Sequence, residues 1–236
     1  MTRSAKIGVR ELKQRIHALL RQDDFEAALT ALDQLPAREV INPLLYFFYN
    51  RDELVKWRAV TAVGAAVSRL AGTDMESARV VMRRLIWNLN DESGGIGWGA
   101  PEAMGEIMAR HKGLAREYAR ILVSYARKDG NYIEIESLQR GVLWGLGRLA
   151  RAFPELLKDT GVLFPPYLES TDGIVRGLAA RLCGILRVDS ARAFLENLKS
   201  DKTPIPLYCN GKICMDQVSR IAGDALSRMN PGVIYQ

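Results

Sequence analysis

The 236-residue sequence contains few cysteines, few histidines and no long apolar run. Its three cysteines, Cys183, Cys209 and Cys214, are an odd number in a long chain, which argues against a disulfide scaffold and for a reducing compartment. No apolar run approaches the roughly 20 residues that cross a bilayer, and the N-terminus lacks a signal-peptide pattern. We therefore expect a cytoplasmic protein with no membrane partner.

Motifs for catalysis and metal binding are also missing. His17 and His111 lie far apart and have no Cys or Asp partner at catalytic spacing, and Cys209 and Cys214 lack further thiols or histidines nearby. The glycine-rich stretch 94–99 could cradle a phosphate, but no strand precedes it and no Walker lysine follows it. We interpret it as a turn between helices and predict a protein that is not an enzyme and has no cofactor or metal.

Positive charge is concentrated at the N-terminus. The formal net charge is +6, and the first 22 residues contain six bases and one acid, leaving 27 bases and 26 acids for the rest. The body of the chain is therefore almost neutral. We interpret the basic segment as a solvated first helix, with contact to a polyanion as the alternative.

From Asp52 onward the chain repeats itself. DELVKWRAVTAVG, ending at Gly64, returns as DGIVRGLAARLCG, ending at Gly184, and weaker copies end at Gly105, Gly147 and Ser227. The spacings between these anchors are 41, 42, 37 and 43 residues, and each interval contains a second helical pattern. A helix pair that recurs about every 40 residues predicts an all-α fold, a HEAT-like α-solenoid. We expect one domain over 1–236, with capping helices in 1–41 and about five helix pairs in 42–229.

The segments GWGAPEAMGEIMA and LQRGVLWGLGRLA, which end at Ala109 and Ala150, allow a closer comparison. They resemble bacterial HEAT-repeat proteins related to the phycobilisome-lyase HEAT-like repeats. The resemblance implies an α-solenoid and, for most members, no assigned activity. The bilin chemistry of the lyase branch is not carried over, because only the repeat is shared.

A β-hairpin is expected near the C-terminus. In IPLYCNGKICM, Asn210 and Gly211 separate two apolar runs, the strongest short hairpin signal. A two-residue turn would pair Cys209 with Lys212 and Tyr208 with Ile213. The hairpin is predicted to be an insertion between the two helices of the last repeat.

The aligned repeats separate a core face from a face that mixes tryptophan with charge. Positions five and one before each anchor are apolar in every copy and predict the core, while the anchor glycines are expected to let neighbouring helices approach closely. The second face is expected to line the concave surface and to bind a partner. Its predicted binding residues are Trp57, Trp98, Glu102, Glu106, Arg140, Trp144, Arg148 and Arg181.

Neighbouring helices would place Trp98 beside Arg140 and Glu106 beside Arg148, so Glu102 and Glu106 are expected to be ion-paired. Two interpretations remain open: a ladder that locks repeats together, or a hot spot for a protein partner. We favour a non-enzymatic adaptor or scaffold for a protein partner. The alternative is a DNA-binding protein similar to the base-excision glycosylases built from HEAT-like repeats, although the sequence has no Trp-Trp-Asp run and no basic track.

Overall fold

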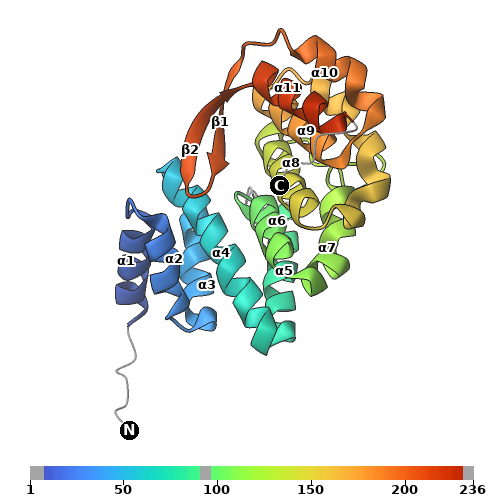
Figure 1. Cartoon of the computed structure of the whole chain (residues 1–236). Coiled ribbons are helices and arrows are strands. Elements are labelled where there is room, and N and C mark those ends of the chain that lie inside the picture. Colours follow the sequence, from blue (N-terminus) through green and yellow to red (C-terminus); the bar gives the residue numbers. More distant parts are fainter. Residues whose placement is uncertain (1–7, 91–96, 231–236) are drawn as a thin grey trace.

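The computed structural model describes residues 8–90 and 97–230 as a succession of helices with one β-hairpin before the last helix. Residues 94–96 of the glycine-rich stretch and the first residues of the basic segment lie outside this range. None of the described helices is long and apolar enough to cross a membrane. The predicted all-α solenoid with a C-terminal hairpin is confirmed (Figure 1).

Five helices form the inner layer, and each packs against the next in the series. They are α4 (Glu53–Thr73), α6 (Ala100–Arg110), α8 (Glu136–Ala152), α9 (Gly173–Leu186) and α11 (Val218–Met229). Every predicted core position on these helices is buried, from Ala59 on α4 to Leu226 on α11. The apolar stripes of the repeats therefore meet in one continuous core.

The remaining helices cover the outside of this layer or the N-terminal end of the array. The outer elements are α3 (Ala37–Tyr46), α5 (Met75–Leu89), α7 (Lys112–Ser124) and α10 (Arg192–Leu198), with the 3-10 helices η1 (Phe47–Tyr49), η2 (Pro154–Leu163), η3 (Pro165–Glu169) and η4 (Asp189–Ala191). The N-terminal pair is α1 (Val9–Leu20) and α2 (Phe25–Asp33). The outer segment between α8 and α9 is divided into two 3-10 helices, because Pro165 and Pro166 interrupt it after η2.

The aspartates that open the two best repeats are helix caps. The Asp52 carboxylate accepts hydrogen bonds from the backbone N–H groups of Leu54 and Val55, and Asp172 accepts one from Ile174. Asn42-Pro43 has the sequence pattern of a helix cap followed by a first-turn proline, but no helix begins there. Helix α3 begins at Ala37, and Pro43 lies inside it.

Close contact between inner helices depends on glycine at particular places. An added Cβ at Gly105 would lie 2.3 Å from the Cα of Gly145, so α6 and α8 approach to the limit of backbone contact there. The expectation fails at Gly147, where an added Cβ would meet nothing within 4 Å. The close approach on α8 is made by Gly145, two residues before the aligned anchor.

The hairpin consists of β1 (Pro204–Cys209) and β2 (Lys212–Gln217), between α10 and α11 as predicted. Its register pairs Cys209 with Lys212 and Tyr208 with Ile213, which confirms the sequence prediction. Asn210 and Gly211 have φ of 49° and 77°, the left-handed values of a type I′ turn. The hairpin does not stay beside its own repeat. It reaches back across the inner face toward α2 and α4 (Figure 1).

We predict that Gly105→Ala lowers the free energy of unfolding by about 2 kcal/mol or more, because its methyl group forces α6 and α8 apart. Gly147→Ala is the matched control and should change stability by less than about 1 kcal/mol, toward greater stability, because the site has room and alanine favours helix. Urea unfolding of both variants measures the difference. Equal effects would contradict the proposed backbone contact.

Candidate functional site

The hairpin packs its β1 strand onto the tryptophans of the inner face. The Tyr208 ring stacks on Trp57 with ring centroids 5.2 Å apart and an interplanar angle of 10°, and Trp57 lies 4.9 Å from Trp144. The Tyr208 hydroxyl is 2.9 Å from the Thr61 hydroxyl, within hydrogen-bonding distance. These contacts hold a strand from the last repeat against helices α4 and α8.

The tip of the hairpin is fixed by Arg58, a buried residue on α4. Arg58 Nε donates to the Gly211 carbonyl over 2.9 Å, and its Nη1 donates to the carbonyls of Leu20 and Gln22 over 3.0 and 2.6 Å. Its guanidinium also lies 4.9 Å from the Phe25 ring centroid. One side chain thus joins the hairpin turn to the N-terminal helices.

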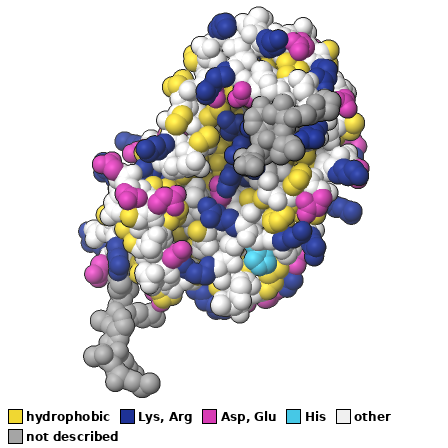
Figure 2. All heavy atoms as spheres, in the orientation of Figure 1, with side chains coloured by type: hydrophobic (Ala, Val, Ile, Leu, Met, Phe, Trp, Pro, Cys, Tyr) yellow, Lys and Arg dark blue, Asp and Glu magenta, His cyan; other side chains and the backbone are white. Residues whose placement is uncertain are grey.

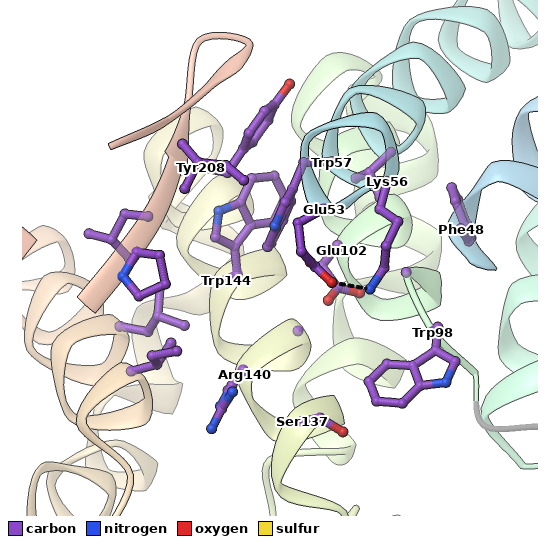
Figure 3. Close-up of a pocket in the computed structure, with 18 residues that line it drawn as sticks. Phe48, Glu53, Lys56, Trp57, Trp98, Glu102, Ser137, Arg140, Trp144 and Tyr208 are labelled. Carbon is purple, nitrogen blue, oxygen red and sulfur yellow. Dashed lines mark hydrogen bonds and ion pairs between the residues drawn. The ribbon is translucent and has the colours of Figure 1, made fainter. Parts of the chain in front are cut away.

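A hollow of about 450 Å³ remains between the hairpin and helices α4, α6, α8 and α9. We call it the tryptophan pocket, and Figure 3 shows its walls. Its lining residues are Phe48, Glu53, Lys56, Trp57, Val60, Trp98, Gly99, Glu102, Ser137, Arg140, Gly141, Trp144, Ile174, Leu178, Pro206, Leu207, Tyr208 and Ile213. The hollow therefore combines aromatic walls with a few charged groups.

The charged groups of the tryptophan pocket are arranged differently from the sequence prediction. Trp98 and Arg140 both line the pocket, but the cation over the Trp98 ring is Lys56, whose Nζ is 5.6 Å from the ring centroid. Lys56 also forms an ion pair with Glu53, at 2.6 Å. Arg140 is paired with Asp172, the buried cap of α9. Asp172 was not among the aligned positions from which the ladder was predicted, and its pairing with Arg140 determines the orientation of the Arg140 side chain.

Glu102 is not ion-paired within the described part of the chain, contrary to expectation. Its Oε2 atom is inaccessible to solvent and has no hydrogen-bond partner among the described residues. Burial raises the pKa of Glu102 to about 7, against the opposing effects of a backbone hydrogen bond and Lys56. In Figure 3 its side chain lies beside Glu53 and Lys56. The pocket therefore contains a carboxyl group that changes charge near neutral pH.

Glu106, one turn further along α6, has the partners that Glu102 lacks. Its Oε1 lies 2.8 Å from Arg148 Nε, and its Oε2 lies 3.2 Å from Arg110 Nε. The predicted pairing of Glu106 with Arg148 is confirmed. Arg148 also lies 5.9 Å from the ring centroid of Trp144 on the same helix. The Glu106–Arg148 pair holds α6 and α8 together.

The eight predicted residues divide between two hollows. The tryptophan pocket contains Trp57, Trp98, Glu102, Arg140 and Trp144, while a second hollow contains Glu106, Trp144, Arg148 and Arg181. Sequence reasoning missed Lys56, Arg58 and Tyr208. Arg58 directly precedes the apolar run AVTAV at residues 59–63, and this position was a signal for a buried guanidinium. No group of three or more metal-ligating side chains occurs in residues 8–90 and 97–230.

We predict that Glu102→Gln removes a pH dependence from folding stability. The folded state favours the neutral acid, so unfolding releases a proton between pH 4.5 and 7, and stability falls as pH rises through that range. The variant should match the wild type at pH 4.5 and exceed it by up to about 3 kcal/mol at pH 8.

Urea unfolding at both pH values measures this effect. Glu117→Gln is the control, because Glu117 lies at the surface paired with Arg79 and its pKa is lowered rather than raised. An unchanged pH profile in Glu102→Gln would contradict the assignment.

Comparison with known proteins supports the fold. No protein-family model and no curated protein matches the chain. Among solved structures, a designed armadillo repeat protein is similar at 18% identity and a TM-score of 0.52, over 93% of this chain and all of that one. A second, solved in complex with the peptide (KR)4, gives 19% identity and a TM-score of 0.52 over 93% of this chain and all of that one.

An archaeal HEAT-like repeats protein from Thermococcus onnurineus is also found, with 16% identity and a TM-score of 0.42, over 96% of this chain and 82% of that one. At these identities the comparisons establish the fold alone. The chain has the architecture of an armadillo- or HEAT-like repeat solenoid.

Proposed function

We propose that the protein is a cytoplasmic, non-enzymatic scaffold that holds a protruding group of a protein partner in the tryptophan pocket. The observation that carries this proposal is the pocket itself, a hollow of about 450 Å³ walled by Trp57, Trp98, Trp144 and Tyr208. Tryptophan, tyrosine and arginine are the residue types that contribute most to protein-binding hot spots.

The accessibility of the tryptophans supports a binding role for one wall in particular. Trp144 is buried, at 6% exposure, and Trp57 is stacked under Tyr208, so both serve chiefly to build the pocket. Trp98 is partly exposed and contacts no other aromatic ring of the described residues within the pocket. A ligand would therefore add most of its aromatic contact at Trp98.

Two polar features of the pocket supply selectivity. The unpartnered Glu102 oxygen can accept a hydrogen bond from a donor that enters the pocket, which would satisfy a buried polar atom. At the rim, Glu53, Lys56 and Arg140 carry both signs of charge. A partner group with an apolar body and a donor at its end fits this arrangement.

The fold and the lining are consistent with binding rather than catalysis. One solved armadillo-type neighbour is in complex with a peptide, so a fold of this kind can hold one. The described lining contains neither histidine nor cysteine, and its hydroxyl groups are Ser137 and Tyr208. The described lining therefore holds no hydroxyl or thiol with a histidine base beside it.

We predict that Trp98→Ala weakens capture of a protein partner by roughly tenfold to a hundredfold, because it removes the accessible aromatic wall. The immobilised wild type and variant are incubated with lysate of the source organism, with and without nuclease. Trp87→Ala is the matched control, because Trp87 lies 65% exposed on the outer helix α5, away from the pocket.

A protein retained by wild type and Trp87→Ala, lost by Trp98→Ala and insensitive to nuclease supports the proposal. Identical capture by all three would overturn it, and the tryptophans would then be a lock between repeats. Capture that requires nucleic acid and weakens steeply with salt would favour the DNA-binding alternative.

A further inference from the structure

A second hollow, of about 300 Å³, lies on the other side of Trp144 and Tyr208, which line both hollows. We call it the arginine pocket. It is lined by Phe25, Glu26, Leu29, Thr61, Glu106, Arg110, Leu143, Trp144, Gly147, Arg148, Arg151, Leu178, Arg181, Tyr208, Cys209, Asn210 and Gly211. Helix α2 and the hairpin turn close two of its sides, and Figure 2 shows Lys and Arg side chains around the central hollow of this face.

Positive charge exceeds negative charge in this lining. Four arginines, Arg110, Arg148, Arg151 and Arg181, face only two carboxylates, Glu26 and Glu106, which leaves an excess of two positive charges. This local excess contrasts with the near-neutral body of the chain. Charge balance inside the hollow is therefore incomplete without an anion.

Of the two carboxylates that line the arginine pocket, only Glu106 is buried, and it is already paired with two arginines. Glu106, at 3% exposure, pairs with both Arg110 and Arg148 and holds their guanidinium groups in place. Arg151 and Arg181 form no ion pair with any described carboxylate. Arg181 Nη1 makes a long polar contact with the Cys209 sulfur, at 3.9 Å. Two guanidinium groups thus remain available for a ligand.

Crowding of like charge supports the same conclusion. The pKa of Arg151 is lowered, first by burial and then by the positive charges of Arg181, Arg228 and Arg148. An arginine whose charged form is disfavoured gains most from an anion nearby. The walls of the arginine pocket are also fixed before any ligand binds, because Arg58 holds the hairpin turn and the Thr61 hydroxyl is hydrogen-bonded to the Tyr208 hydroxyl.

We propose that the arginine pocket binds an oxyanion of the phosphate monoester class. The planar guanidinium fork matches phosphate oxygens in pairs, and a dianion would neutralise the excess charge of the lining. The hollow is small and bounded on two sides by α2 and the hairpin turn, and its four arginines line this one hollow instead of following a track. That geometry favours a single terminal group over a nucleic-acid backbone.

The test is isothermal titration of the full chain at constant ionic strength, in a buffer without phosphate or sulfate. Inorganic phosphate and O-phosphoserine are separate probes. We expect saturable one-to-one binding by the wild type, and on the order of tenfold or more weaker binding by Arg151→Gln/Arg181→Gln. Tighter binding of phosphoserine would indicate an esterified phosphate as the source, and equal binding would indicate free phosphate.

The matched control is Arg116→Gln/Arg120→Gln, which removes two exposed arginines from the outer helix α7 and makes the same change in net charge. It should bind phosphate within about twofold of the wild type. Equal losses in both double variants would show general charge attraction and overturn the proposal, as would an absence of saturable binding. Strong binding of a 12-nucleotide single-stranded DNA, lost with Arg151 and Arg181, would overturn it in favour of a nucleic-acid site.

A stability measurement separates binding from a structural role. Because Arg151 and Arg181 repel each other and form no described ion pair, Arg151→Gln/Arg181→Gln should unfold in urea at the wild-type midpoint or above it without phosphate. Added phosphate should raise the midpoint of the wild type only. A lower midpoint without phosphate would mean that these arginines support the fold, against the proposal.

Discussion

The hydrogen bonds of Arg58 fix the β-hairpin in place, and both hollows depend on the hairpin for a wall. A buried guanidinium is unfavourable unless its donors are satisfied, and here three backbone carbonyls accept from it. One carbonyl belongs to Gly211 in the hairpin, and the other two belong to Leu20 and Gln22 at the end of α1. Gly211 is 153 residues from Arg58 along the chain, whereas Leu20 and Gln22 are 38 and 36 residues from it. Arg58 therefore ties the last repeat to the N-terminal cap.

Helix α6 shows how two identical side chains, one turn apart, differ in their ion pairing because they meet different neighbours. Glu102 and Glu106 are one turn apart, so a single helix presents both on the inner face. Glu106 meets Arg148 and Arg110, whereas Glu102 meets Lys56, which is already paired with Glu53. The pKa of Glu102 is consequently raised by burial. Neighbouring turns of one helix thus give the tryptophan pocket a carboxyl group with no described ion pair and the arginine pocket one that is ion-paired.

Much of the fold was predictable because its determinants are local. The Asp caps, the 40-residue period and the core positions recur in the sequence, and Asn210-Gly211 determined the hairpin register. The position at which the hairpin docks on the inner face was not predictable, because it depends on tertiary contacts of Arg58 and Tyr208 with distant segments. The ladder was correct where both partners lay on the aligned face, as for Glu106 and Arg148. It was wrong at Arg140, because the cap Asp172 of the next helix takes that side chain.

The docked hairpin limits what the inner face can receive. An undivided solenoid surface offers a continuous groove, but here Tyr208 and Trp144 separate two hollows of about 450 and 300 Å³. Stacking on Trp57 and the bonds of Arg58 hold the dividing wall in place before any ligand arrives. A ligand would therefore not have to order the site, so less of its contact energy is lost to conformational entropy. We infer that this face suits small protruding groups better than a long peptide laid along the repeats.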